Sequence, residues 1–145
     1  MFDVEVNGDV ADCEAIEAVS IEIMQNLMPR TTRPINIYID FVTHCDSEVA
    51  GDCHGDKNDV FINIAKNSFG YAYTVDEQLL TLCHELVHAK QFLKGELSES
   101  GKIWKGVDMS MMTHIKQQPW EQEAFQLELE LYKKHIHTGT QENKS

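Results

Sequence analysis

The stretch Thr74–Gly95, TVDEQLLTLCHELVHAKQFLKG, predicts one long helix in the middle of the 145-residue chain. Thr74 and Glu77 form a T-x-x-E capping box, in which each side chain accepts a hydrogen bond from the other residue's backbone N–H. Lys94 and Gly95 are typical of a helix C-terminus. Apolar side chains recur at the helical period and predict a stripe that faces the core, made of Leu79, Leu82, Cys83, Leu86 and Val87.

His84, Glu85 and His88 form an H-E-x-x-H motif at the polar edge of that stripe. Positions i and i+4 of a helix lie on one face, so the two imidazoles can bind one metal ion. The side chain of Glu85 is turned away by about 100°, which lets it reach a metal-bound water without being a ligand. The motif therefore predicts His84 and His88 as metal ligands and Glu85 as a general base.

A catalytic zinc ion takes three protein ligands and keeps a fourth position for water, so a third ligand is required. The metzincin motif continues with Gly and His where this chain has Gln91 and Lys94, and that class is excluded. Residues 119–125, PWEQEAF, supply carboxylates instead. Glu123 falls on the apolar side of the helix predicted there, where a carboxylate is costly unless it is paired or binds a metal. We expect Glu123 as the third ligand, with Glu121 as the alternative ligand or, beside Glu123, as a partner of the site or an exposed spectator.

Other segments also have recognisable periods. Asp12–Met28 has apolar residues at helical spacing and ends before Pro29. Residues 35–41 and 59–65 alternate apolar and polar side chains, as half-buried strands do. A last helix begins at Pro119, a residue that suits the first turn of a helix.

The connections between these segments are polar. Residues 43–58 join the two predicted strands and are rich in Gly and Asp. Residues 96–118 are long for a connection in a compact domain, which predicts a functional loop, a hidden strand or a short helix. We expect one α+β domain over residues 1–137, with a small mixed sheet, and a flexible polar tail over residues 138–145.

The formal net charge is −12, from 12 basic and 24 acidic residues. Such a surface repels phosphate backbones and anionic lipids, so we expect no direct nucleic-acid partner and no membrane partner. No apolar run approaches the length of about 18 residues that a membrane span needs, and the acidic N-terminus does not have the pattern of a signal peptide. The four cysteines contain no C-x-x-C pair. We expect a cytoplasmic protein, in the host cytoplasm if the gene belongs to a phage.

The motif H-E-L-V-H-A at residues 84–89, followed by a helix bearing E-A-F at 123–125, resembles the gluzincins, whose zinc is held by H-E-x-x-H and a glutamate helix. The letters W-K-G at 104–106 and P-W-E-x-E-A at 119–124 are similar to short, phage-type SprT-like metallopeptidases, and the size is similar to that of minigluzincins. The resemblance covers residues 35 to 132. It implies a zincin-like fold, with a small twisted sheet, an active-site helix beneath it and a glutamate helix alongside.

The chain departs from these families at the partners of the metal ligands. The thermolysin-like pattern has an Asp four residues beyond the ligand Glu to orient a zinc histidine, and this chain has Leu127 there. Classical SprT-like enzymes use a third histidine, which makes His114 an alternative to Glu123 as ligand.

The resemblance implies a zinc metalloendopeptidase that acts on a peptide or protein substrate. Zn²⁺ would activate a water molecule and Glu85 would take its proton, while His114, Tyr71 and Tyr73 are candidates for stabilising the oxyanion. The substrate is expected to lie extended against an exposed edge strand, residues 59–65. Two alternatives stay open, a non-catalytic zinc-binding interaction domain and a peptidoglycan endopeptidase. The oligomeric state is left unknown.

Overall fold

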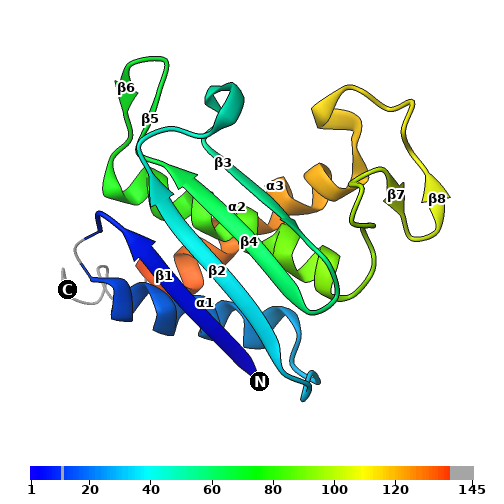
Figure 1. The fold of residues 1–145 in the computed structure, drawn as a ribbon, viewed down its shortest axis with the longest axis horizontal. Helices are drawn as coiled ribbons and strands as arrows, with labels where there is room; N and C mark the ends of the chain where they lie inside the picture. The colour runs from blue at the N-terminus through cyan, green and yellow to red at the C-terminus, as the bar shows by residue number, and fades with distance from the viewer. Residues whose placement is uncertain (11, 138–145) are drawn as a thin grey trace.

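A four-stranded mixed sheet with helices packed on one of its faces forms the body of the protein (Figure 1). The structure is a computed structural model and describes residues 1–10 and 12–137. The strands are β1 (Phe2–Gly8), β2 (Ile35–Val42), β3 (Gly51–Gly55) and β4 (Asp59–Ala65). Their order is β1-β2-β4-β3, with β3 antiparallel to β4 and the other neighbours parallel. The predicted α+β class and mixed sheet are confirmed, whereas the tail predicted at 138–145 lies outside the described residues.

The helices are α1 (Cys13–Leu27), α2 (Val75–Leu93) and α3 (Pro119–Tyr132). α1 packs against β1, α2 packs against β3 and β4, and α3 packs against α2. Shorter elements connect them: η1 (Asp46–Glu48), β5 (Asn67–Ser68), β6 (Tyr71–Ala72), β7 (Ile103–Trp104), β8 (Val107–Asp108), η2 (Ile115–Gln117) and η3 (Lys133–His137). Among the described helices, none combines the length and the apolar character that crossing a bilayer requires.

The core lies between the sheet and the helices because each long strand alternates buried and accessible side chains. The register aligns Val4, Ile37 and Val60 in one row across β1, β2 and β4. These side chains meet two buried residues of α1, Ile23 and Met24, and the predicted stripe of α2. That stripe is confirmed, since Leu82, Cys83, Leu86 and Val87 are fully buried and Leu79 packs beside them.

Helix α2 begins and ends where its sequence predicts. The Glu77 N–H donates to Thr74 Oγ1 at 3.1 Å, and the Thr74 N–H donates to Glu77 Oε1 at 2.9 Å, so the capping box is formed. The helix ends at Leu93, and Gly95 adopts a φ of +72°, a conformation that glycine takes without steric cost. The H-E-x-x-H motif thus lies in the second half of a firmly defined helix, against the sheet.

Two strands of the four-stranded sheet, β1 and β3, are absent from the sequence predictions. β1 follows the alternation of Phe2, Val4 and Val6, a period-two signal in a short N-terminal segment. β3 lies inside the connection 43–58, whose Gly-rich sequence carries no apolar alternation. It pairs with β4 and forms the edge of the sheet next to α2. The expectation that residues 59–65 are an exposed edge is therefore wrong, because β4 lies between β2 and β3.

The long connection before α3 contains structure of its own, as predicted. β7 and β8 form a short antiparallel hairpin, and the 3₁₀ helix η2 follows it before Pro119. Leu97 forms an isolated bridge with Trp104, which ties the hairpin to the chain just after α2. This segment stands beside the sheet edge in Figure 1 and approaches the region where α2 and α3 meet.

Candidate metal centre

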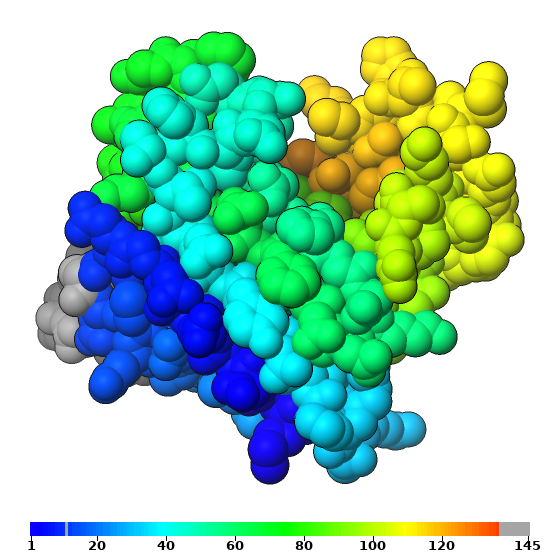
Figure 2. Space-filling model, in the orientation of Figure 1, coloured from blue at the N-terminus to red at the C-terminus, as the bar shows by residue number. Residues whose placement is uncertain are grey.

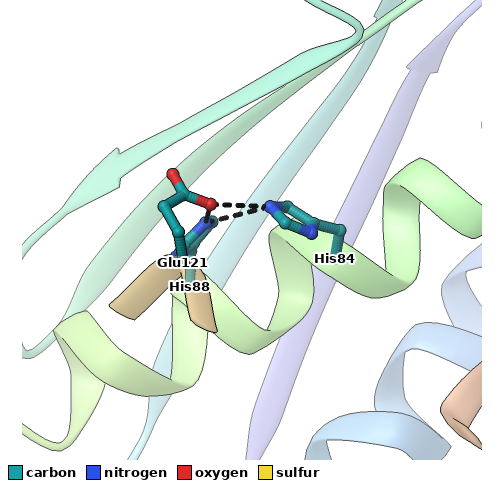
Figure 3. A group of neighbouring side chains, drawn as sticks. All are labelled: His84, His88 and Glu121. Atoms are coloured by element: carbon teal, nitrogen blue, oxygen red, sulfur yellow. Dashed lines mark hydrogen bonds and ion pairs between the residues drawn. The ribbon is translucent and has the colours of Figure 1, made fainter. Parts of the chain in front are cut away.

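His84 and His88 of α2 meet Glu121 of α3 in one tight cluster (Figure 3). The Oε1 atom of Glu121 lies 3.0 Å from Nε2 of His84 and 3.0 Å from Nε2 of His88, and the two Nε2 atoms are 3.2 Å apart. Within residues 1–10 and 12–137, this is the group of His, Cys, Asp and Glu side chains whose ligand atoms converge, all within 4.8 Å of one another. The predicted pair of histidines is thus joined by a carboxylate.

The third member of the cluster, Glu121, lies on α3, and the position of Glu121 around the axis of that helix turns its side chain toward the histidines. Pro119 occupies its first turn, and Glu121 follows within the same turn. Phe125 and Glu128 continue the row at i+4 and i+7, a spacing that places all three on one face. That face is turned toward His84. The ring centroids of Phe125 and His84 are 4.8 Å apart, and Glu128 contacts the same histidine.

Glu123, the carboxylate expected as third ligand, lies elsewhere, and that expectation is corrected. Its two oxygens accept hydrogen bonds from Lys90 Nζ at 3.0 and 2.9 Å, and Oε1 also accepts one from Gln91 Nε2 at 2.9 Å. The premise that an inward carboxylate needs a partner holds. The partner is a lysine, and the ion pair is buried at its lysine end only, since Lys90 is 7% exposed whereas the side chain of Glu123 is 27% exposed.

Each histidine also has a partner on its second ring nitrogen. Nδ1 of His84 lies 3.0 Å from Glu128 Oε1, and Nδ1 of His88 lies 2.7 Å from Gln91 Oε1. Acceptors at Nδ1 hold the proton there and leave the lone pair of Nε2 for a metal ion. Glu128, two turns beyond Glu121, thus makes the kind of contact with a histidine that the thermolysin-like pattern gives to an Asp.

The electrostatics of the cluster follow from a carboxylate placed between two imidazoles. Burial alone would raise the pKa of Glu121, but hydrogen bonds and charges from His84 and His88 outweigh it and lower this pKa to about 2. Burial opposes the imidazolium form of His84, yet bonds to Glu121 and Glu128 prevail and raise its pKa to about 10. The pKa of His88 is raised for similar reasons, with Glu121 as the chief partner. The cluster thus attracts positive charge strongly, and a metal ion would displace the protons that meet this demand.

Glu85 lies beside the cluster and is almost fully buried, with 5% of its surface exposed. Desolvation raises the pKa of this carboxyl to about 7, against the opposing charges of His88 and His84. The carboxylate lies close to Gly51 of β3: a Cβ atom at position 51 would lie 3.1 Å from Glu85 Oε2 and 2.7 Å from Thr81 Cγ2. The absence of a side chain at Gly51 therefore makes room for Glu85.

A cleft of about 530 Å³ opens over the cluster. One wall is the edge strand β3 with Val49 and Ala50 before it, and the other is Ile115 and the start of α3. Figure 2 shows this hollow between the segment that carries η1 and β3 and the segment that precedes α3. Its rim presents exposed apolar side chains, with Val49 at 42%, Phe125 at 51% and Ile115 at 59% exposure.

The described lining of this cleft contains none of the three predicted oxyanion candidates, His114, Tyr71 and Tyr73. His114 lies in a separate surface pocket with Met109 and Met112, and the described lining of the cleft includes its neighbour Ile115 instead. The hydroxyl of Tyr71 donates to Glu77 at 2.8 Å, at the start of α2. Neither His114 nor Tyr71 belongs to the converging group of ligand atoms.

Sequence reasoning ranked Glu121 below Glu123, and it missed Glu128 and Gln91, the partners of the two histidines. The row formed by Glu121, Phe125 and Glu128 has helical spacing, and this signal could have identified Glu121 and Glu128 together. For Gln91 the only sequence signal is a polar residue three positions after His88, on the face that carries the motif.

Searches with protein-family models, against curated proteins and against solved structures find no match for this chain.

Proposed function

We propose that this protein is a zinc-dependent metallopeptidase in which His84, His88 and Glu121 hold the ion and Glu85 is the general base. The observation that carries the proposal is the convergence of two helical imidazoles and one carboxylate from another helix under an open cleft. The H-E-x-x-H motif supplies the general base at the position where zincins have it. A zincin-like architecture of gluzincin type, with α2 as active-site helix and α3 as glutamate helix, belongs to the same proposal.

The donor set suits zinc. Two imidazole nitrogens and one carboxylate oxygen are the protein ligands of many catalytic zinc sites, and they leave one position for water or substrate. When bound, zinc would supply a Lewis acid that polarises a carbonyl and lowers the pKa of a water molecule. A purely structural zinc site closes all four positions with protein atoms. The converging group in the described residues has three members, which favours the enzyme over the non-catalytic domain.

Glu85 is placed for proton transfer. It is almost fully buried beside Gly51, and this burial raises the pKa of its carboxyl to about 7. The charge of a bound cation would lower this pKa and favour the carboxylate, which is the form that a general base requires. Glu85 takes a proton from the attacking water and delivers it to the amine that leaves the scissile bond. The low exposure of Glu85 keeps bulk water from competing for that proton.

The proposed substrate is a polypeptide bound in extended form along β3. This strand pairs with β4 on one side, and its other side lines the cleft. An edge strand offers backbone N–H and C=O groups in a row, to which an extended peptide adds as a further strand. Apolar side chains of the substrate would contact Val49, Ile115 and Phe125 at the rim.

The test combines metal analysis with peptide cleavage. Wild-type protein should bind one zinc ion per chain and cleave unstructured polypeptides, and Glu85→Gln should retain zinc while losing cleavage by at least about 10²-fold. Glu121→Ala should lose zinc, whereas Glu130→Ala, at an exposed position of the same helix, should behave as wild type. Full cleavage by Glu85→Gln would exclude the mechanism. Zinc binding without cleavage of polypeptides would favour the non-catalytic domain, or the peptidoglycan endopeptidase if cell-wall peptides are cut.

A further inference from the structure

Gln91 is completely buried between α2 and α3 and reaches the metal centre through His88. Its Oε1 atom lies 2.7 Å from His88 Nδ1. Its Nε2 atom donates to the carbonyl oxygen of Trp120 at 2.9 Å and to Glu123 Oε1 at 2.9 Å. Three hydrogen bonds thus hold the amide group with no exposure to solvent.

The orientation of this amide follows from the chemistry of its partners. A backbone carbonyl and a carboxylate only accept hydrogen bonds, so the NH₂ group of Gln91 must face Trp120 and Glu123. Its oxygen then faces His88, and because an amide oxygen only accepts, Nδ1 of His88 carries the proton. In the neutral ring Nε2 keeps a free lone pair, and this atom lies 3.0 Å from Glu121 Oε1. Gln91 therefore selects the tautomer that binds metal through Nε2.

Glu123, the carboxylate partner of Gln91, is itself held in place by Lys90. Lys90 Nζ donates to both oxygens of Glu123 and lies 2.8 Å from Glu96 Oε1. Lys90 is nearly buried, so its ammonium group is held by these carboxylates rather than by bulk water. The contacts from Lys90 through Glu123 and Gln91 to His88 form one continuous path.

The same amide also ties the backbone beside Glu121 to α2. Trp120 directly precedes Glu121, and its carbonyl oxygen accepts a hydrogen bond from Gln91 Nε2. Trp120 is buried and belongs to the core, so this part of α3 has little freedom to shift. One side chain thus contacts the ring of one candidate ligand and the main chain next to another.

We propose that Gln91 is a positioning residue of the metal centre. It holds His88 in the tautomer and ring orientation that present Nε2 to the ion, and it holds α3 where Glu121 reaches the same ion. The inference rests on the proposed function, because it requires the cluster to bind metal. It also assigns Glu123 an indirect role, since the carboxylate fixes the amide of Gln91, which in turn contacts His88.

The first test is Gln91→Met, which keeps the side-chain length and removes both hydrogen-bonding ends. Zinc affinity, measured by competition with a chromophoric chelator, should fall about 10- to 100-fold, as happens when outer partners of metal ligands are lost. The absorption bands of the Co²⁺-substituted protein should shift, because the ligand geometry changes. The matched control is Gln122→Met, an exposed glutamine of α3 whose Nε2 donates to the Lys116 carbonyl oxygen. It should leave both readouts unchanged.

The second test uses the wild-type protein and does not depend on a variant that folds. In zinc-loaded protein with ¹⁵N-labelled histidine, the His88 ring should bind zinc through Nε2 and carry a proton on Nδ1. That proton should exchange with solvent slowly, and far more slowly than the ring protons of the exposed His54. Coordination through Nδ1, or exchange as fast as that of His54, would overturn the proposal.

The outcomes separate this inference from the proposed function. If wild type and Gln91→Met bind zinc equally, with the same cobalt spectrum, the positioning role is wrong and the metallopeptidase proposal stands. A lower free energy of unfolding with unchanged zinc affinity would make Gln91 a residue of structure alone, which also contradicts the inference. If the wild-type protein binds no zinc, the proposed function fails first and the positioning role fails with it.

Discussion

Glu128 contacts Nδ1 of His84 at 3.0 Å, two helical turns beyond Glu121, which meets Nε2 of the same ring at 3.0 Å. Two residues on one face of α3 therefore contact both ring nitrogens of a single histidine. A carboxylate at Nδ1 holds the proton there and increases the basicity of the ring toward a metal ion. The glutamate helix thus has two functions in the proposed site, to supply a ligand and to orient the histidine opposite it.

Replacing Glu128 with Ala should weaken zinc binding without abolishing it. The expected loss is about 10- to 100-fold in affinity, because His84 keeps its place on α2 but loses the acceptor that orients its ring. Chelator competition measures the loss. Glu130→Ala removes a carboxylate from the exposed side of the same helix and should retain wild-type affinity. Equal affinities for the two variants would show that Glu128 is not needed.

Zinc should stabilise the folded protein, because the three ligand atoms converge only in the native state. A ligand present at 100 times its dissociation constant adds about 2.7 kcal/mol to the free energy of unfolding. Addition of a strong chelator should therefore lower the thermal midpoint of wild-type protein measured by circular dichroism. The Glu121→Ala variant should show a much smaller shift. An identical shift in this variant would mean that zinc binds elsewhere.

Adding a methyl group at Gly51 should disturb Glu85 and the fold together. The new Cβ would lie 2.7 Å from Thr81 Cγ2, 3.1 Å from the Asn63 carbonyl oxygen and 3.1 Å from Glu85 Oε2. We expect Gly51→Ala to cost about 1–3 kcal/mol in the free energy of unfolding, as overpacking does, and to lower kcat while zinc stays bound.

A second substitution separates these two effects of the alanine at position 51. Thr81→Ser removes Cγ2 but keeps the hydroxyl that donates to the Glu77 carbonyl oxygen. In the Gly51→Ala background it should restore part of the stability and none of the activity, because the contact with Glu85 persists. Restored activity would show that Glu85 tolerates the new methyl group.

Trimming Ile115 at the rim of the cleft should change the choice of substrate. Ile115 is 59% exposed and lines the cleft, so Ile115→Ala should reduce kcat/KM about tenfold for peptides with large apolar side chains near the scissile bond. Peptides with small residues there should be cleaved at nearly the wild-type rate. Met111→Ala changes a more exposed side chain of the same segment, outside the described cleft lining, and serves as control. A uniform loss for all peptides would contradict a specificity role.

The capping box of α2 should make stability depend on pH through Glu77. The pKa of this carboxyl lies below its ordinary value of 4.5, because it accepts hydrogen bonds from the Thr74 N–H and the Tyr71 hydroxyl. A lowered pKa in the folded state means that the contribution is complete above 4.5 and is lost as the pH falls through the folded-state pKa. Urea titrations should show Glu77→Gln less stable than wild type at neutral pH, with the difference closing in acid. A difference that persists in acid would exclude an ionised cap.

The helices and the motif were predictable because their signals are local. The hydrogen bonds of a helix join residues four apart. The cap at Thr74, the stop at Gly95 and the i,i+4 pair of histidines can therefore be predicted without the rest of the chain. The same holds for the strands β2 and β4, whose alternation is strong. β3 was not predicted because its sequence, GDCHG, has no apolar alternation. Its place at the edge of the sheet is defined by pairing with β4.

The choice between Glu121 and Glu123 shows where local reasoning ends. Two residues along a helix are about 200° apart around its axis, so the two carboxylates point to nearly opposite sides. Both sides of α3 carry apolar residues, and the sequence pattern favoured the side with Glu123. The structure pairs Glu123 with Lys90, a residue of α2 that no periodicity connects with it.

The amino-acid order alone specified a helix with two histidines and a glutamate between them, since those relations span a few residues and depend on backbone geometry that is the same in every helix. The carboxylate that joins the histidines, the partners of both rings and the wall of the cleft depended on how α3 and β3 pack against that helix. Packing is set by the fit and charge of side chains far apart in the chain, such as Lys90 with Glu123 and Gly51 with Glu85. Only the folded molecule brings those pairs together.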